Sequence, residues 1–87
     1  MPERSFLHVS SAVVCVRPER AQAVIAAISA MQATEVHAHD AARIVVVMEG
    51  RSTGELGDRL ASIALTPGVI AANMVFEHVE ELEETPS

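Results

Sequence analysis

The sequence predicts a ferredoxin-like α+β sandwich, in which two helices cover one face of a four-stranded antiparallel sheet. The hydrophobic periodicity runs strand, helix, strand, strand, helix, strand along the chain. The first and third strand segments are the most apolar, which predicts that they are central and that the other two are edges. Right-handed crossovers then place both helices on the same side of the sheet. The expected strands are residues 6–16, 34–40, 43–49 and 69–79, and the expected helices are residues 18–32 and 52–65.

Composition limits the class of protein. The 87 residues suffice for one domain, and only two of them are aromatic, so the core must consist of Val, Ala, Ile and Leu. The net charge of −6 argues against nucleic acid and anionic membranes as partners, and favours a neutral or cationic partner. No apolar run approaches the roughly 18–20 residues that span a bilayer, and the first residues do not resemble a signal peptide. We expect a cytoplasmic protein with no membrane insertion.

Each expected helix has a start signal and an apolar stripe. Pro18 suits a first helical turn, where its missing N–H is no loss. Ser52 and Glu55 have capping-box spacing, in which Ser52 accepts from the Glu55 amide and Glu55 reaches back to the Ser52 amide. The expected sheet-facing positions are Ala21, Val24, Ile25, Ile28 and Met31 in the first helix, and Leu56, Leu60, Ile63 and Ala64 in the second. Residues 1–79 should form a single domain, and residues 80–87 an acidic disordered tail.

Alternation along the strands assigns side chains to the two faces of the sheet. Facing the helices, we expect Ala12, Val14, Val16, Val36, Ala38, Ile44, Val46, Met48, Ile70, Ala72, Met74 and Phe76. The opposite face should carry the intervening residues, including Cys15, His37, His39, Arg43 and Val69. The first strand is ambiguous, and the reverse assignment of its two faces stays open.

Two short helices cover only one face of a four-stranded sheet, so the other face is left apolar and exposed. An exposed apolar face rimmed by polar residues is typical of a docking surface. Valines form its expected centre and carboxylates its rim, which suits an apolar peptide that carries positive charge. The expected peptide-binding residues are Val9, Ser11, Val13, Glu35, Val45, Val47, Glu49, Ala71, Asn73, Val75 and Glu77.

Catalytic and metal sites are not expected. Cys15 is the single cysteine, which rules out an intramolecular disulfide or a multi-cysteine zinc site. His37 and His39 lie two residues apart on a strand, but two ligands do not make a metal site and no third is implied. No nucleophile–base motif or phosphate loop appears. We therefore expect a protein that is not an enzyme and has no metal or cofactor.

Several segments resemble the NapD family. They are residues 10–14 (SSAVV), 17–19 (RPE), 43–49 (RIVVVME) and 67–78 (PGVIAANMVFEH), followed by an acidic tail. The resemblance implies a cytoplasmic chaperone with a ferredoxin-like fold. Such a chaperone binds the twin-arginine signal peptide of the periplasmic nitrate reductase catalytic subunit on its sheet, and delays export until the molybdenum cofactor is inserted. It also implies no catalytic residues. Phe76 stands where the family often has Tyr.

Other functions fit the same pattern of elements. One is a small-ligand regulatory domain of the amino-acid-binding kind, which uses this scaffold and is usually dimeric. Another is a structural subunit whose open face is permanently covered by a partner. The open face could also pack against a second copy of the chain. Under the leading hypothesis we expect a monomer or a weak dimer.

Overall fold

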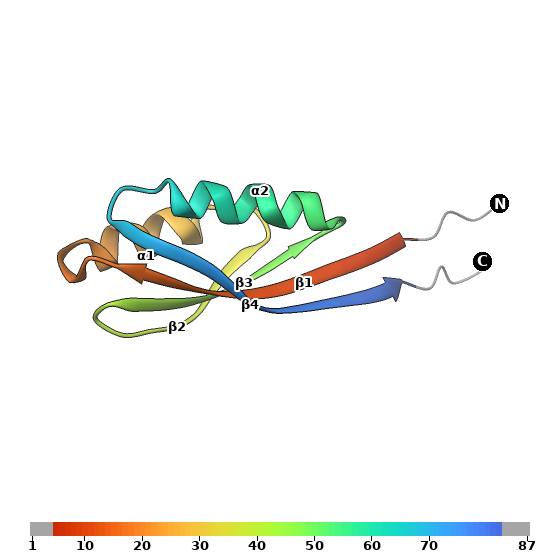
Figure 1. Ribbon diagram of the computed structural model, residues 1–87, viewed down its shortest axis with the longest axis horizontal. Coiled ribbons are helices and arrows are strands. Elements are labelled where there is room, and N and C mark those ends of the chain that lie inside the picture. The colour runs from red at the N-terminus through yellow and green to blue at the C-terminus, as the bar shows by residue number, and fades with distance from the viewer. Residues whose placement is uncertain (1–4, 83–87) are drawn as a thin grey trace.

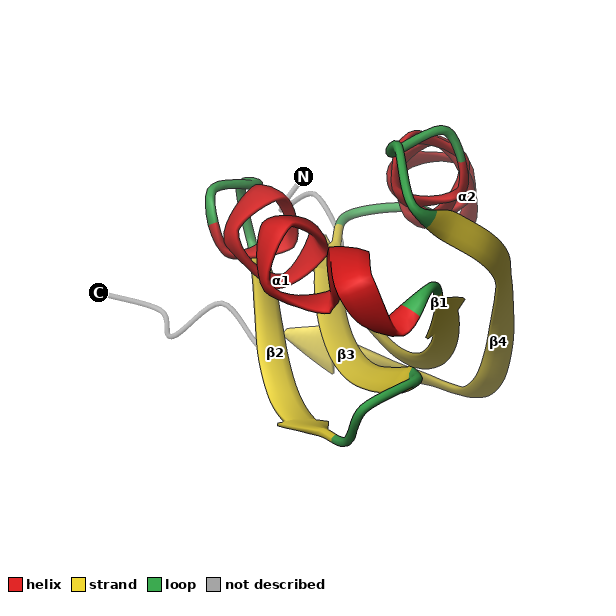
Figure 2. Cartoon of the chain, turned by 90° about the vertical axis from the view of Figure 1, so that its left-hand side faces the viewer, coloured by secondary structure: helices red, strands yellow, loops and turns green. Residues whose placement is uncertain are grey.

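The computed structural model describes residues 5–82. A four-stranded antiparallel sheet has the strand order β2-β3-β1-β4, with both helices on one face (Figures 1 and 2). The elements are β1 (Ser5–Val16), a 3-10 turn (Pro18–Arg20), α1 (Ala21–Ser29), β2 (Thr34–His39), β3 (Arg43–Gly50), α2 (Thr53–Ala64) and β4 (Val69–Leu82). The predicted fold class, central strands and edge strands are confirmed.

The core lies between the sheet and the two helices, and it contains no aromatic side chain among its buried members. Alternate residues of the two central strands point into it, and the helices close it from above. Its fully buried members are Ala12, Val14, Val16, Val24, Ile28, Ile44, Val46, Met48, Leu56 and Ile63. The two predicted apolar stripes face the core, except that Ala64 is exposed at the end of α2 and that Met31 packs against the core from beyond the end of α1.

The first helix is shorter than predicted. Pro18–Arg20 forms a 3-10 turn, and the α-helix begins only at Ala21. It ends at Ser29, and Ala33 takes a left-handed conformation with φ 53° before β2 begins. The positive φ of Ala33 turns the chain immediately before the first residue of β2, Thr34, so residues 30–33 form the connection and not a last helical turn.

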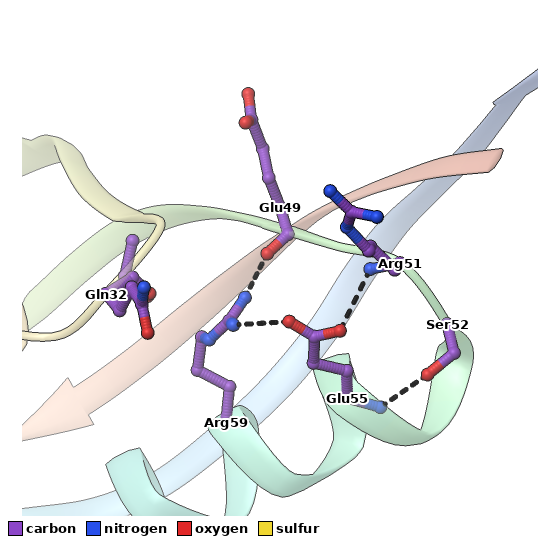
Figure 3. A network of polar contacts seen from close by, with 7 residues as sticks. Gln32, Glu49, Arg51, Ser52, Glu55 and Arg59 are labelled. Carbon is purple, nitrogen blue, oxygen red and sulfur yellow. Dashed lines mark hydrogen bonds and ion pairs between the residues drawn. The ribbon is translucent and has the colours of Figure 1, made fainter. Parts of the chain in front are cut away.

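The start of α2 is fixed to the end of β3 by a small polar network (Figure 3). The Ser52 hydroxyl accepts a hydrogen bond of 3.1 Å from the Glu55 amide, as predicted. The Glu55 carboxylate, however, accepts from the Arg51 N–H at 3.1 Å and not from the Ser52 N–H. The Arg59 guanidinium donates to Glu55 at 3.0 Å and to the Glu49 backbone carbonyl. The Arg51 N–H, assisted by Arg59, lowers the pKa of the Glu55 carboxyl.

Strands β1 and β4 continue as a two-stranded ribbon beyond the end of β3 at Gly50. Their pairing reaches Ser5 opposite Leu82, and the molecule is consequently elongated, at 52 × 20 × 20 Å (Figure 1). The expectation of a disordered tail from residue 80 is wrong for the last three residues of β4, because the start of β1 gives them a strand to pair with. The rest of that expected tail, 83–87, lies outside the described residues.

Candidate functional site

The face of the sheet turned away from α1 and α2 is the candidate site, and we call it the open face (Figure 2). Its membership follows from strand register, because directly paired residues point to the same side of a sheet. In β1, the residues that alternate with the buried ones are half-buried, which settles the ambiguous first strand as assigned. The open face contains Val9, Ser11, Val13, Cys15, Glu35, Ala38, Arg43, Val45, Val47, Glu49, Ala71, Asn73, Phe76, His78 and Glu80.

These residues form successive rows across the sheet. Glu49, Val9 and His78 make one row, and Glu35, Val47, Ser11 and Phe76 make the next. Ala38, Val45, Val13 and Asn73 follow, and Arg43, Cys15 and Ala71 make the last. The centre is therefore mostly Val and Ala, as predicted, and the charges lie at the two ends. Nine of the eleven expected peptide-binding residues share this face, the exceptions being Val75 and Glu77.

A bulge at Val75 displaces the end of β4 by one residue. Met74 pairs with Ala12 on the helix side, whereas Phe76 pairs with Ser11 on the open face, leaving Val75 as the extra residue. Val75 is therefore unpaired, and its side chain is 61% exposed. The expectation that Phe76 belongs to the core is wrong: 58% of this residue is exposed on the open face.

The same bulge moves Glu77 off the open face. Glu77 pairs with Ser10, a fully buried residue on the helix side. Its carboxylate lies 4.0 Å from His8 Nδ1, and that nitrogen and the Ser10 hydroxyl are buried without a hydrogen-bond partner in the described part of the chain. Glu77 is therefore a neighbour of this buried polar pair, and its predicted place at the rim is wrong.

A second bulge in β4 changes which face of the sheet the first residues of the strand occupy. Cys15 pairs with Ala71 and Val16 with Val69, so Ile70 is the extra residue. Val69 consequently packs against the core, although alternation assigned it to the open face. Ile70 was expected inside and is 67% exposed. The sequence alone carries no signal for either bulge.

A third irregularity lies in β2, at His37. Val36 pairs with Val46 and Ala38 with Val45, so His37 is the extra residue and Ala38 joins the open face. His39 pairs with Ile44, whose side chain is in the core. The bulge thus breaks the regular alternation that placed both histidines on one face. Among residues 5–82, no group of three or more His, Cys, Asp or Glu is arranged to hold a metal ion.

Two shallow hollows lie at opposite ends of the β2–β3 pair. One, of about 270 Å³, is lined by Ala33, Thr34, Glu35, Val47 and Glu49. The other, of about 320 Å³, is lined by Val13, Ala38, His39, Asp40, Arg43 and Val45. Both include open-face valines as part of their walls, so they are extensions of the same surface.

The carboxylates at the two hollows differ in whether they accept hydrogen bonds from the protein itself. Asp40 closes the β2–β3 turn, where its carboxylate accepts 2.9 Å hydrogen bonds from the Ala42 and Arg43 N–H groups. These two backbone donors hold the pKa of Asp40 below its ordinary value of 3.8. Within the described residues, the Glu35 and Glu49 carboxylates take part in no hydrogen bond or ion pair. They are free to receive a cationic ligand.

The family described as NapD protein matches residues 7–81, which cover all of the strands and helices except the first two residues of β1 and the last residue of β4. The chain belongs to the NapD family of chaperones. It is 43% identical over 82 residues to Chaperone NapD of Paracoccus pantotrophus, a match that covers 94% of this chain and 73% of that protein. The resemblance noted in the sequence is thereby confirmed.

Solved structures agree with this assignment. The solution structure of the E. coli Tat proofreading chaperone protein NapD superposes with a TM-score of 0.77 at 30% identity, covering 93% of this chain and 88% of that one. A transcriptional regulatory protein of the AsnC family from Pyrococcus furiosus gives a TM-score of 0.64 at 14% identity, over 91% and 53% of the two chains. The second likeness shows the fold alone. No helix within residues 5–82 is long and apolar enough to cross a membrane.

Proposed function

We propose that this chain is a cytoplasmic chaperone that binds the twin-arginine signal peptide of the periplasmic nitrate reductase catalytic subunit. Binding delays export until the cofactor has been inserted. The observation that carries the proposal is the open face itself, an apolar surface without a cover in a member of the NapD family. The names of its relatives, a NapD chaperone and a Tat proofreading chaperone, support the choice of ligand.

The chemistry of a twin-arginine signal matches that of the face. Such a signal joins two arginines to an apolar stretch, and the face joins two free carboxylates to a floor of valines. From Val9 to Cys15, β1 advances about 20 Å at about 3.3 Å per residue. A helix about 10 Å wide laid along this length would contact about 200 Å² of the face.

The expected affinity follows from that area. Removing about 200 Å² from water on each partner gives about 10 kcal/mol at 25 cal/mol per Å². Lost translational and rotational freedom opposes association by at least about 4 kcal/mol. A net value of about 6 kcal/mol corresponds to a dissociation constant of tens of micromolar, and the arginine contacts tighten it further. In this role the protein binds and releases its ligand, and no catalytic step is required of it.

The test is a calorimetric titration with a synthetic twin-arginine signal peptide of the nitrate reductase catalytic subunit. We expect saturable binding at micromolar concentrations, and we expect Val47→Glu to weaken it because a carboxylate would then lie in the apolar floor. Ala61→Glu, which places the same charge on the exposed side of α2, is the matched control. The absence of saturable binding to the unmodified protein would refute the proposal.

Oligomeric state provides a second check. We propose a monomer or weak dimer, because the peptide needs the open face to be accessible. Sedimentation of the free protein should show the monomer as the main species, and peptide should shift its stability whereas free amino acids should not. A stable dimer with an amino-acid-dependent thermal shift would instead support a regulatory domain.

A further inference from the structure

The open face has opposite charge at its two ends. Glu35, Glu49 and Glu80 lie where β2 begins and β3 and β4 end, and we call this the acidic end. Arg43 lies at the other end of the same face, opposite Cys15, and we call this the basic end. The uncharged row of Ala38, Val45, Val13 and Asn73 separates the two ends, so the charge difference runs parallel to the strands.

At the acidic end, the geometry suits a guanidinium group. Glu35 and Glu49 line the same hollow, with Val47 between them. Val47 pairs directly with Glu35 and is two residues from Glu49, so the two carboxylates are diagonal neighbours whose backbones are about 7–8 Å apart. A planar guanidinium placed between them can donate to both.

The neighbouring arginine of α2 leaves these carboxylates available. Arg59 donates to the backbone carbonyl of Glu49 and to the Glu55 carboxylate. Figure 3 shows the Glu49 carboxylate pointing away from Arg59 and α2. The negative charge at this hollow therefore remains without an internal counter-ion in the described chain.

At the basic end, an arginine of the ligand would be disfavoured. The Asp40 carboxylate also lines this hollow, but its Oδ1 accepts two backbone N–H donors of the turn and its charge is offset by the adjacent Arg43. The Arg43 side chain is exposed beside a hollow whose other walls are mainly Val13, Ala38 and Val45. This hollow can accept an apolar side chain, but a second guanidinium there would face a like charge.

We propose that this asymmetry fixes the direction of the bound peptide. The arginine pair lies at the Glu35–Glu49 hollow, and the apolar stretch runs parallel to the strands over Val45 and Val13 toward Arg43. The distance of about 20 Å from the Val9 row to the Cys15 row accommodates about 13 helical residues at 1.5 Å each. This inference rests on the proposed function, because it assumes that a twin-arginine signal peptide occupies the open face.

Paramagnetic labelling of the peptide tests the direction. Two versions of the signal peptide carry a nitroxide, one beside the arginines and the other at the far end of the apolar stretch, and each is added to ¹⁵N-labelled protein. The first should broaden the amide signals of Glu35 and Glu49 at least several-fold more than those of Arg43 and Ala71, and the second should do the reverse. The opposite pattern, or equal broadening at both ends, overturns the inference while leaving peptide binding intact. Absence of any shift with unlabelled peptide instead refutes the proposed function.

Charge variants test the guanidinium site separately. The Glu35→Gln/Glu49→Gln protein should bind the arginine peptide about tenfold more weakly, the effect expected of exposed charge-assisted contacts. It should also lose the preference of the unmodified protein for arginine over a peptide with glutamine at both positions. Glu19→Gln/Asp58→Asn removes two exposed charges on the helical side and is the matched control. Retention of the full arginine preference in the Glu35→Gln/Glu49→Gln protein would contradict the assignment of this hollow.

Discussion

Phe76 and Glu77 provide the sharpest test of the open face, because alternation and the observed register assign them in opposite ways. The bulge at Val75 places Phe76 opposite Ser11 on the open face and Glu77 opposite Ser10 on the helix side. We predict that Phe76→Ala weakens binding of the signal peptide, and that Glu77→Ala leaves binding nearly unchanged. Strict alternation predicts the reverse order.

The magnitude follows from the exposure of the phenylalanine. A Phe side chain carries about 200 Å² of surface, and 58% exposure leaves about 115 Å² in contact with water. If a docked peptide covers half of this area, the contact contributes about 1.4 kcal/mol at 25 cal/mol per Å². Truncation to Ala should therefore raise the dissociation constant about tenfold.

The assay is fluorescence anisotropy of a labelled signal peptide, titrated with each variant after circular dichroism has verified its fold. Val79→Ala is the matched control, since Val79 is a similarly exposed apolar residue of β4 that pairs with His8 on the helix side. Unchanged binding by Phe76→Ala, together with a large loss for Glu77→Ala, would refute the register argument.

Three further predictions concern folding. Val13→Glu should fold normally but bind peptide poorly, whereas Val14→Glu should not fold, because Val14 is fully buried. Heteronuclear NMR spectra will distinguish the folded variant from the unfolded one. A folded Val14→Glu protein would contradict the assignment of the two faces of β1. Gly68→Ala should lower the free energy of unfolding in urea by about 2–4 kcal/mol, because Gly68 has φ +98° and an added Cβ would lie 2.5 Å from Arg20 Cβ. A decrease of less than about 1 kcal/mol would be inconsistent with the backbone conformation at Gly68. The pKa of Asp40 is lowered in the folded state, so its contribution to stability is fully present above its ordinary value of 3.8 and is lost as the pH falls through the lowered value. The Asp40→Asn protein should therefore lose less stability between pH 5 and pH 2 than the unmodified protein. An equal loss of stability in the two proteins would contradict the role of the Asp40 carboxylate.

Local periodicity predicted the fold because each element has a clear pattern of its own. The helical spacing of Val24 and Ile28 in α1 and the apolar run of β3 can be recognised without knowing which distant residues they contact. The choice of central strands also followed from local composition. The same alternation placed nine of the expected site residues on one face, in agreement with the register of the three strand pairs.

Other features depend on partners distant in the sequence. Residues Glu80–Leu82 read as part of an acidic tail, and they are a strand because the first residues of β1 lie beside them. Likewise, the Arg59 guanidinium of α2 donates to the Glu49 carbonyl at the end of β3, ten residues earlier in the chain, while it also donates to the Glu55 carboxylate. Neither outcome is contained in the local pattern around the residue.

By itself, then, the sequence determined the order of elements, the part of the core formed by the helices and the two central strands, and the existence of an uncovered apolar face. Only the tertiary structure decided which side of β4 meets that face. The alternation of residue types is a property of one strand, and it gives no sign of where a bulge interrupts the pairing. The extra residue, Val75, is defined only by the hydrogen-bond register with β1. A shift of one residue exchanges the two faces of everything beyond it, and for this reason Phe76 lies on the open face and Glu77 does not.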